Sequence, residues 1–293
     1  MDASATHTPT PTAPARALLP GMRLLLLAFS VLTALAVVTL FVLASQTDAT
    51  FAWTIQPPLT AAFLGAGYAA GCALVVLSLR DGVWVRTRVP LLTILVFVVI
   101  TLASTLLHLD RFHFSAEFAD RPMIAQGAAW FWLTIYVVVP VAMLALLLPQ
   151  ERTAGTDPPP RHPVPRVLRG LLGVESAVLT LVGAALFVAP STAATLWPWP
   201  LTPLTARVVA AWLVAFGVAT ALAAVAGDLE RLRTAAIAYT VFGVLVLVAV
   251  ARFPGTLDWD QPPAWIFVGV AVAVVLTGAA GWRAAPAASR TDG

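Results

Sequence analysis

The sequence predicts an all-α polytopic membrane protein with eight transmembrane helices, arranged as two parallel four-helix repeats. Hydrophobic residues make up 60% of the 293 residues and charged residues 11%, whereas soluble domains hold about 45–50% and about 25%. Several apolar stretches run for about 20 residues, which is enough to cross a hydrocarbon core about 30 Å thick. The first half of the sequence is also similar to the second half at a nearly constant offset, so the eight spans are expected to form two similar units.

The internal repeat relates residues 53–113 to residues 198–258 without a gap, at an offset of 145 positions. The tetrapeptide Pro-Leu-Thr-Ala that begins at Pro58 recurs at Pro203, and the match continues upstream at an offset of 146. Each unit would hold four spans, and an even number gives both units the same orientation in the membrane. Repeats of this kind tend to place a site or a pathway at the interface between the halves.

Each span is predicted from an apolar run bounded by proline, glycine or charged residues. The first run could be mistaken for a signal peptide, but its length of about 20 residues exceeds the usual 7–15 of a signal core. We therefore expect it to be retained. The predicted spans lie near residues 24–44, 59–79, 89–109, 128–148, 169–189, 203–226, 233–252 and 264–282.

The segments outside the spans complete the expected domain organisation. Proline, threonine and alanine dominate the N-terminal segment, and prolines recur between the halves, so neither segment is expected to form helix. The predicted domains are a disordered cytoplasmic N-terminus (1–20), a first repeat (21–148), a proline-rich cytoplasmic linker (149–166), a second repeat (167–282) and a disordered cytoplasmic tail (283–293).

Orientation is predicted from the arginines, which supply all 17 basic residues. Most precede the first span, follow the eighth, or lie between spans two and three, four and five, and six and seven. The positive-inside rule places this side, with both termini, in the cytoplasm. The lack of lysine and asparagine is typical of a high-GC bacterial genome, so a bacterial plasma membrane is expected. The arginines are dispersed along the chain, and no nucleic-acid partner is predicted.

Polar side chains inside predicted spans are the first candidates for a ligand or proton site, because charges are rare at such depths. Glu175 lies about two turns into the fifth span, and Tyr239 lies at a similar depth in the seventh. We hypothesise a hydrogen bond between them, which would serve either as a structural polar contact or as a proton or ligand site. The alternative is that Glu175 forms no such bond and extends its carboxyl group toward the membrane surface. Arg207 lies about one turn into the sixth span and is interpreted as a boundary residue.

Tryptophans gather in the predicted outer loops, where Trp53, Trp197 and Trp199 stand beside prolines. One interpretation is an aromatic belt at the level of the lipid headgroups. The other is that these stiff loops fold inward as a lid over an outward-facing cavity, which would make the three tryptophans ligand candidates. Small residues in span two, including Gly67 and Gly71, let helices approach closely, so spans two and six are expected to be inner helices.

A cluster of histidines and carboxylates follows the third span and is not repeated in the second half. It consists of His108, Asp110, His113 and Glu117. Neutral imidazole and carboxylate suit zinc or a related divalent cation, and could also perform acid–base chemistry. The spacing matches no zinc signature, and a solvated loop is the alternative. No other cofactor is predicted.

A Trp/Pro-rich loop followed by Pro-Leu-Thr-Ala occurs in both halves, and each half has four predicted spans. In these features the chain resembles uncharacterised multi-pass membrane proteins of high-GC bacteria. The resemblance covers most of the chain and implies the architecture, but no activity.

Three functions fit the sequence. The favoured one is a permease-like or ligand-binding membrane protein that holds a small apolar or lipid-like molecule between the repeats. The second is a non-enzymatic accessory or assembly subunit that docks a larger membrane complex through a protein partner. The third, less favoured, is a membrane enzyme that uses the outer histidine and carboxylate cluster. The lipid bilayer is the partner common to all three.

Overall fold

The computed structural model describes residues 14–285, and within this range eight helices are long and apolar enough to cross a membrane. No β-strand occurs in the described part of the chain, so the all-α membrane class is confirmed. The long helices are α1 (Pro20–Val37, continued by the π-helical turn Val38–Val42), α3 (Pro58–Asp81), α4 (Trp84–Leu106), α5 (Met123–Glu151), α6 (Arg166–Val188), α8 (Pro203–Ala226), α9 (Leu229–Arg252) and α10 (Pro262–Ala284). The short helices are α2 (Thr47–Thr50) and α7 (Pro190–Ala193).

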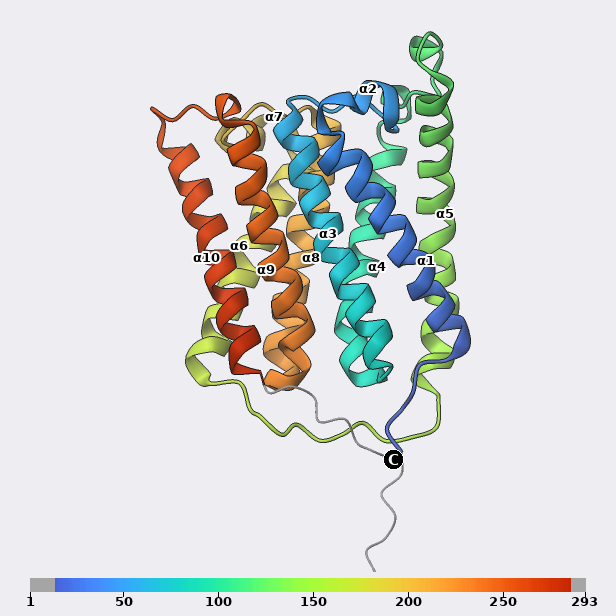
Figure 1. Ribbon diagram of the computed structural model, residues 1–293, viewed down its shortest axis with the longest axis vertical. Coiled ribbons are helices and arrows are strands. Elements are labelled where there is room, and N and C mark those ends of the chain that lie inside the picture. The colour runs from blue at the N-terminus through green and yellow to red at the C-terminus, as the bar shows by residue number, and fades with distance from the viewer. Residues whose placement is uncertain (1–13, 286–293) are drawn as a thin grey trace, which may run out of the picture.

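The long helices form two layers of four, and each layer takes helices from both halves of the chain (Figure 1). In one layer α1 packs on α3, α3 on α9, and α9 on α10. In the other α6 packs on α8, α8 on α4, and α4 on α5. These contacts correspond in the two halves under the sequence offset. This correspondence shows only that equivalent helix pairs are in contact. The arrangement of the chain as two structural repeats stays a prediction.

The two central helices α3 and α8 share the same start and stop signals. Each begins with a proline at its first turn, Pro58 or Pro203, where the missing N–H costs no hydrogen bond. Each ends at a glycine in the left-handed conformation, Gly82 with φ 68° and Gly227 with φ 64°. They are also the most buried of the eight helices, as predicted from their small residues.

The observed spans overlap all eight predicted ones, but the segments around the linker differ in part. The prediction ended the fourth span at residue 148, because proline opposes a helix interior. Helix α5 instead runs through Pro149 to Glu151, so the linker covers residues 152–165. Its last turn is held by the buried Gln150, which accepts a hydrogen bond from the Leu19 amide (2.8 Å) and donates one to the Ala17 carbonyl (2.9 Å).

Residues 14–19 belong to the segment predicted to be disordered, yet they bind the loops beside them. Ala15 forms an isolated bridge with Thr156 of the linker, and Ala17 forms one with Val83. The backbone amides of Arg16, Leu18 and Leu19 therefore have partners that are distant in the chain and could not be predicted from local composition. Residues 1–13 and 286–293, also predicted to be disordered, lie outside the described residues.

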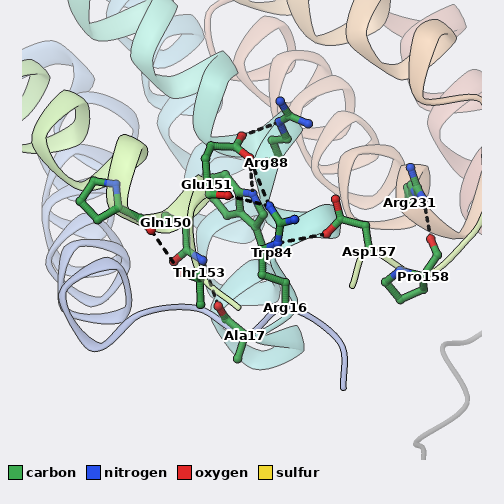
Figure 2. Close-up of polar contacts among 11 residues, drawn as sticks. Arg16, Ala17, Trp84, Arg88, Gln150, Glu151, Thr153, Asp157, Pro158 and Arg231 are labelled. Atoms are coloured by element: carbon green, nitrogen blue, oxygen red, sulfur yellow. Dashed lines mark hydrogen bonds and ion pairs between the residues drawn. The ribbon is translucent and has the colours of Figure 1, made fainter. Parts of the chain in front are cut away.

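The linker, the α3–α4 turn and the α8–α9 turn lie at one end of the bundle, here called the arginine-rich end (Figure 1). At this end Glu151 forms an ion pair with Arg88 (2.8 Å) and accepts hydrogen bonds from Trp84 (3.2 Å) and Arg16 (3.4 Å), as Figure 2 shows. Arg86 pairs with Asp81 of α3 (2.7 Å) and with Glu230 of α9 (2.5 Å), which ties the two halves together. The other end, with α2 and α7, is called the tryptophan-rich end.

Candidate functional site

An apolar cavity of about 580 Å³ lies between the two helix layers, and side chains from all eight long helices line it. Its size falls within the range of about 300–1,000 Å³ that small-molecule sites occupy. Both halves of the chain contribute to it, the first through α1, α3, α4 and α5 and the second through α6, α8, α9 and α10.

Aromatic rings from both layers form the central wall of the cavity. Tyr68 of α3 and Tyr136 of α5 are buried, and their hydroxyl groups hydrogen-bond to each other. Trp132 lies against Tyr136, with ring centroids 4.3 Å apart. The hydrogen bond satisfies two hydroxyl groups that would be costly to leave unpaired in an apolar interior.

Trp212 of α8 lies between the two helix layers and contacts residues of both. Its ring centroid lies 4.0 Å from that of Phe97 and 5.3 Å from that of Tyr68. The indole also lies over Gly67 of α3, where an added Cβ would stand 2.7 Å from Cε2. Glycine is therefore required at position 67, because only a bare backbone admits the ring. The indole N–H of Trp212 is buried and has no hydrogen-bond partner.

Glu175 and Tyr239 both line the cavity, but the structure contradicts the hydrogen bond predicted between them. No hydrogen bond joins these two side chains in the described part of the chain. Tyr239 instead sets its ring edge-on to Phe216, with centroids 6.2 Å apart. Glu175 makes no hydrogen bond or ion pair with any other described residue.

Arg207 is not among the residues that line the cavity. Its Nε donates to the Phe187 carbonyl at the end of α6 (3.0 Å), and its guanidinium lies 5.9 Å from the centre of the Phe187 ring. The same guanidinium donates to His108 Nε2 (2.6 Å). Arg207 thus caps one helix end and joins the two halves, and its interpretation as a boundary residue stays a prediction.

The tryptophans of the outer loops divide into two groups. Trp130 and Trp265 are 58% and 61% exposed, as an aromatic belt requires. The belt interpretation is wrong for Trp53 and Trp199, which are each 2% exposed. Trp199 donates its indole N–H to the Thr60 hydroxyl (2.8 Å), and this bond holds a loop of the second half against α3 of the first.

The inward-folded loops reach the cavity through a neighbour of Trp53. The ring of Trp53 packs against Phe51, with centroids 4.9 Å apart, and Phe51 lines the cavity. Trp197 is partly buried and packs against Trp199 at 5.3 Å. Trp53, Trp197 and Trp199 themselves are not among the lining residues. Trp53 supports the cavity wall from behind, through its contacts with Phe51 and Trp132.

The predicted histidine and carboxylate cluster is dispersed over the tryptophan-rich end. No three histidine, cysteine, aspartate or glutamate side chains in residues 14–285 lie close enough to hold a metal ion. Asp110 pairs with Arg111 (3.0 Å), and Glu117 is exposed to solvent. His108 faces Arg207, as described above. Binding of a divalent metal by these four residues stays a prediction, and their arrangement in the structure adds no support for it.

Both histidines are held in place by hydrogen bonds. His113 donates from Nδ1 to the Phe51 carbonyl (2.8 Å), so its Nε2 accepts from the Thr54 hydroxyl (3.0 Å). Burial lowers the pKa of His113, although the bond to Phe51 opposes the change. Burial and the neighbouring Arg207 lower the pKa of His108. Neutral His113 fastens the loop after α4 to the loop before α3.

Comparison with protein families, with curated proteins and with solved structures finds no match for this chain. The functional conclusion therefore rests on the residues and their arrangement.

The sequence reasoning missed the aromatic wall, although one signal was available. The chain has three tyrosines, and Tyr68, Tyr136 and Tyr239 all lie well inside predicted spans. A tyrosine at that depth needs a partner for its hydroxyl group, so two of them on neighbouring helices predict a hydrogen bond. Phe97 and Trp212 gave no such signal, because apolar rings are ordinary on any face of a membrane helix.

Proposed function

We propose that this chain is a permease-like or ligand-binding protein of a bacterial plasma membrane, and that it holds a small apolar or lipid-like molecule between its two halves. The cavity between the layers carries this proposal, since it is large enough for a small ligand and apolar throughout most of its wall. The arginine-rich end would face the cytoplasm, because arginines favour that side.

The distribution of charge supports a ligand-binding role over an ion-coupled pump. Glu175 is the one carboxylate among the described residues that line the cavity, and no arginine or histidine lines it. Proton and ion pathways through membranes use chains of such groups. A docking subunit without a ligand has no need of a cavity of this size, whereas a ligand-binding protein requires one.

The experiment that tests the proposal fills the cavity with one side chain. An added Cβ at Gly71, which lines the cavity, would make only ordinary contacts at 3.9 Å with Thr33 and Trp212. A leucine at this position would therefore extend into the cavity without forcing the helices apart. Gly269 on α10 is the matched control, since no atom lies within 4 Å of its added Cβ and it does not line the cavity.

Radiolabelled decanol serves as the probe, with protein in nanodiscs of phosphatidylcholine and empty nanodiscs as the blank. Wild type and Gly269→Leu are expected to bind decanol saturably, and Gly71→Leu is expected to bind it at least about tenfold more weakly, because the leucine occupies the ligand volume. Equal binding by all three proteins, or no saturable binding by any, would contradict a ligand site in the cavity. A stoichiometric protein partner together with absent binding would favour the accessory-subunit interpretation.

A further inference from the structure

The chemistry of the cavity wall near Glu175 bears on the class of molecule that the cavity accepts. Glu175 lies nine residues after the start of α6, roughly 14 Å along the helix axis at 1.5 Å per residue. Its carboxyl group is partly buried and lines the cavity, and no described residue gives it a hydrogen bond or a countercharge. A carboxylate in such a place costs free energy unless a partner compensates its charge.

The register of α6 against α8 places aromatic rings at the level of this carboxylate. The hydroxyl of Ser176 donates to the Gly217 carbonyl (2.7 Å), and an added Cβ at Gly217 would stand 3.1 Å from the Ser176 carbonyl oxygen. Helices α6 and α8 run in opposite directions, so Glu175 and Phe216, each one residue earlier, lie on either side of this level, roughly 3 Å apart along the axes at 1.5 Å per residue. Phe216 contacts Trp212 (5.6 Å) and Tyr239 (6.2 Å), so a series of rings leads from the carboxylate to the centre of the cavity.

We propose that the ligand of this cavity is a hydrophobic monocation, whose ammonium group lies at Glu175 and whose apolar part lies along Phe216, Tyr239 and Trp212. This inference rests on the proposed function and names its ligand class. The ammonium group supplies the countercharge that the chain does not. Aromatic faces add to its binding, because their electron-rich surfaces attract cations. Fatty acids and other anionic amphiphiles are disfavoured, since no cationic side chain among the described residues lines the cavity.

Three probes that share a ten-carbon chain test the charge preference in the same nanodiscs. They are decyltrimethylammonium, decanol and decanoate, each radiolabelled, and the permanent charge of the first keeps it cationic at every pH. The proposal predicts that wild type, corrected for empty nanodiscs, binds the ammonium probe most tightly and decanoate most weakly. Glu175→Gln removes the charge with little change of shape, and is expected to lower ammonium affinity relative to decanol by about tenfold or more.

The control is Ser176→Ala, which removes a polar group from the adjacent position that faces α8 and not the cavity. It is expected to leave the preference among the three probes unchanged. Equal affinities for the ammonium probe and decanol, unaltered in Glu175→Gln, would overturn the cation proposal while leaving a ligand-binding cavity in place. Absence of saturable binding for all three probes would overturn the proposed function as well. The order of the probes is measured on wild type, so the test does not depend on the variant folding.

Discussion

Gly67→Ala places one methyl group between the two helix layers, against the indole ring of Trp212. The added Cβ would stand 2.7 Å from Cε2, 2.9 Å from Cδ2 and 3.0 Å from Cζ2 of Trp212. All three atoms belong to one rigid indole, which is itself packed against Phe97 and Tyr68, so the ring cannot move aside alone. Overpacking of this kind costs about 1–3 kcal/mol.

The matched control is Gly269→Ala, where the added methyl group meets no atom within 4 Å. Alanine favours helix over glycine by up to about 1 kcal/mol, so this variant should be as stable as wild type or slightly more stable. Gly67→Ala gains the same helix propensity, so the two variants are expected to differ in free energy of unfolding by the overpacking cost alone, about 1–3 kcal/mol.

The assay is unfolding of the purified protein in mixed micelles by titration with sodium dodecyl sulfate, followed by tryptophan fluorescence and far-ultraviolet circular dichroism. Trp212→Phe in the Gly67→Ala background removes the indole atoms that the methyl group would meet, and should restore part of the lost stability. The packing of α3 against α8 described here would be refuted if Gly67→Ala were as stable as Gly269→Ala.

Three further predictions concern the ends of the bundle. Stability should fall as the pH drops from 7.5 to 5, because His113 has a lowered pKa in the folded protein, and the unfolded chain takes up its proton first, near pH 6.5. Melting temperatures of wild type and His113→Gln across this range check it, and an equally steep fall in the variant would contradict it. Arg86→Gln should lower the free energy of unfolding by about 1–3 kcal/mol, since it leaves Glu230 without its partner at 2.5 Å. Denaturant titration measures this, with Arg283→Gln as the exposed control, and an unchanged unfolding midpoint in Arg86→Gln would contradict the prediction. Trp199→Phe should cost about 1–2 kcal/mol by leaving the buried Thr60 hydroxyl unpaired, and a double-mutant cycle with Thr60→Ala that gave no coupling energy would show that this bond does not hold the loop.

The positions of the spans could be predicted from the sequence, because length and hydropathy decide whether a helix crosses a bilayer. The pairing of the helices could not. Lipid-facing and core-facing side chains are both apolar, so a membrane helix such as α8 gives no polar stripe to show which face packs inward. Small residues were the usable signal, and they identified α3 and α8 as inner helices while leaving their neighbours undetermined.

The candidate site was predicted in part for the same reason. Glu175 and Tyr239 were found because polar groups are conspicuous in an apolar span, and both line the cavity. The hydrogen bond predicted between them is absent from the described residues, because equal depth in the membrane does not bring two side chains into contact, and the Tyr239 ring packs against Phe216 instead. The indole N–H of buried Trp199 is paired with Thr60, which lies 139 residues away in the chain. No local sequence pattern predicts such a contact.

The central claim, that the cavity holds a small molecule, is tested most directly by native mass spectrometry of the chain released gently from its own membranes. If the cavity holds such a molecule, wild type and Gly269→Leu are expected to retain a small hydrophobic molecule bearing a positive charge, and Gly71→Leu is expected not to retain it. Spectra in which none of the three chains retains a small molecule, or in which wild type carries only a stoichiometric protein partner, would contradict it.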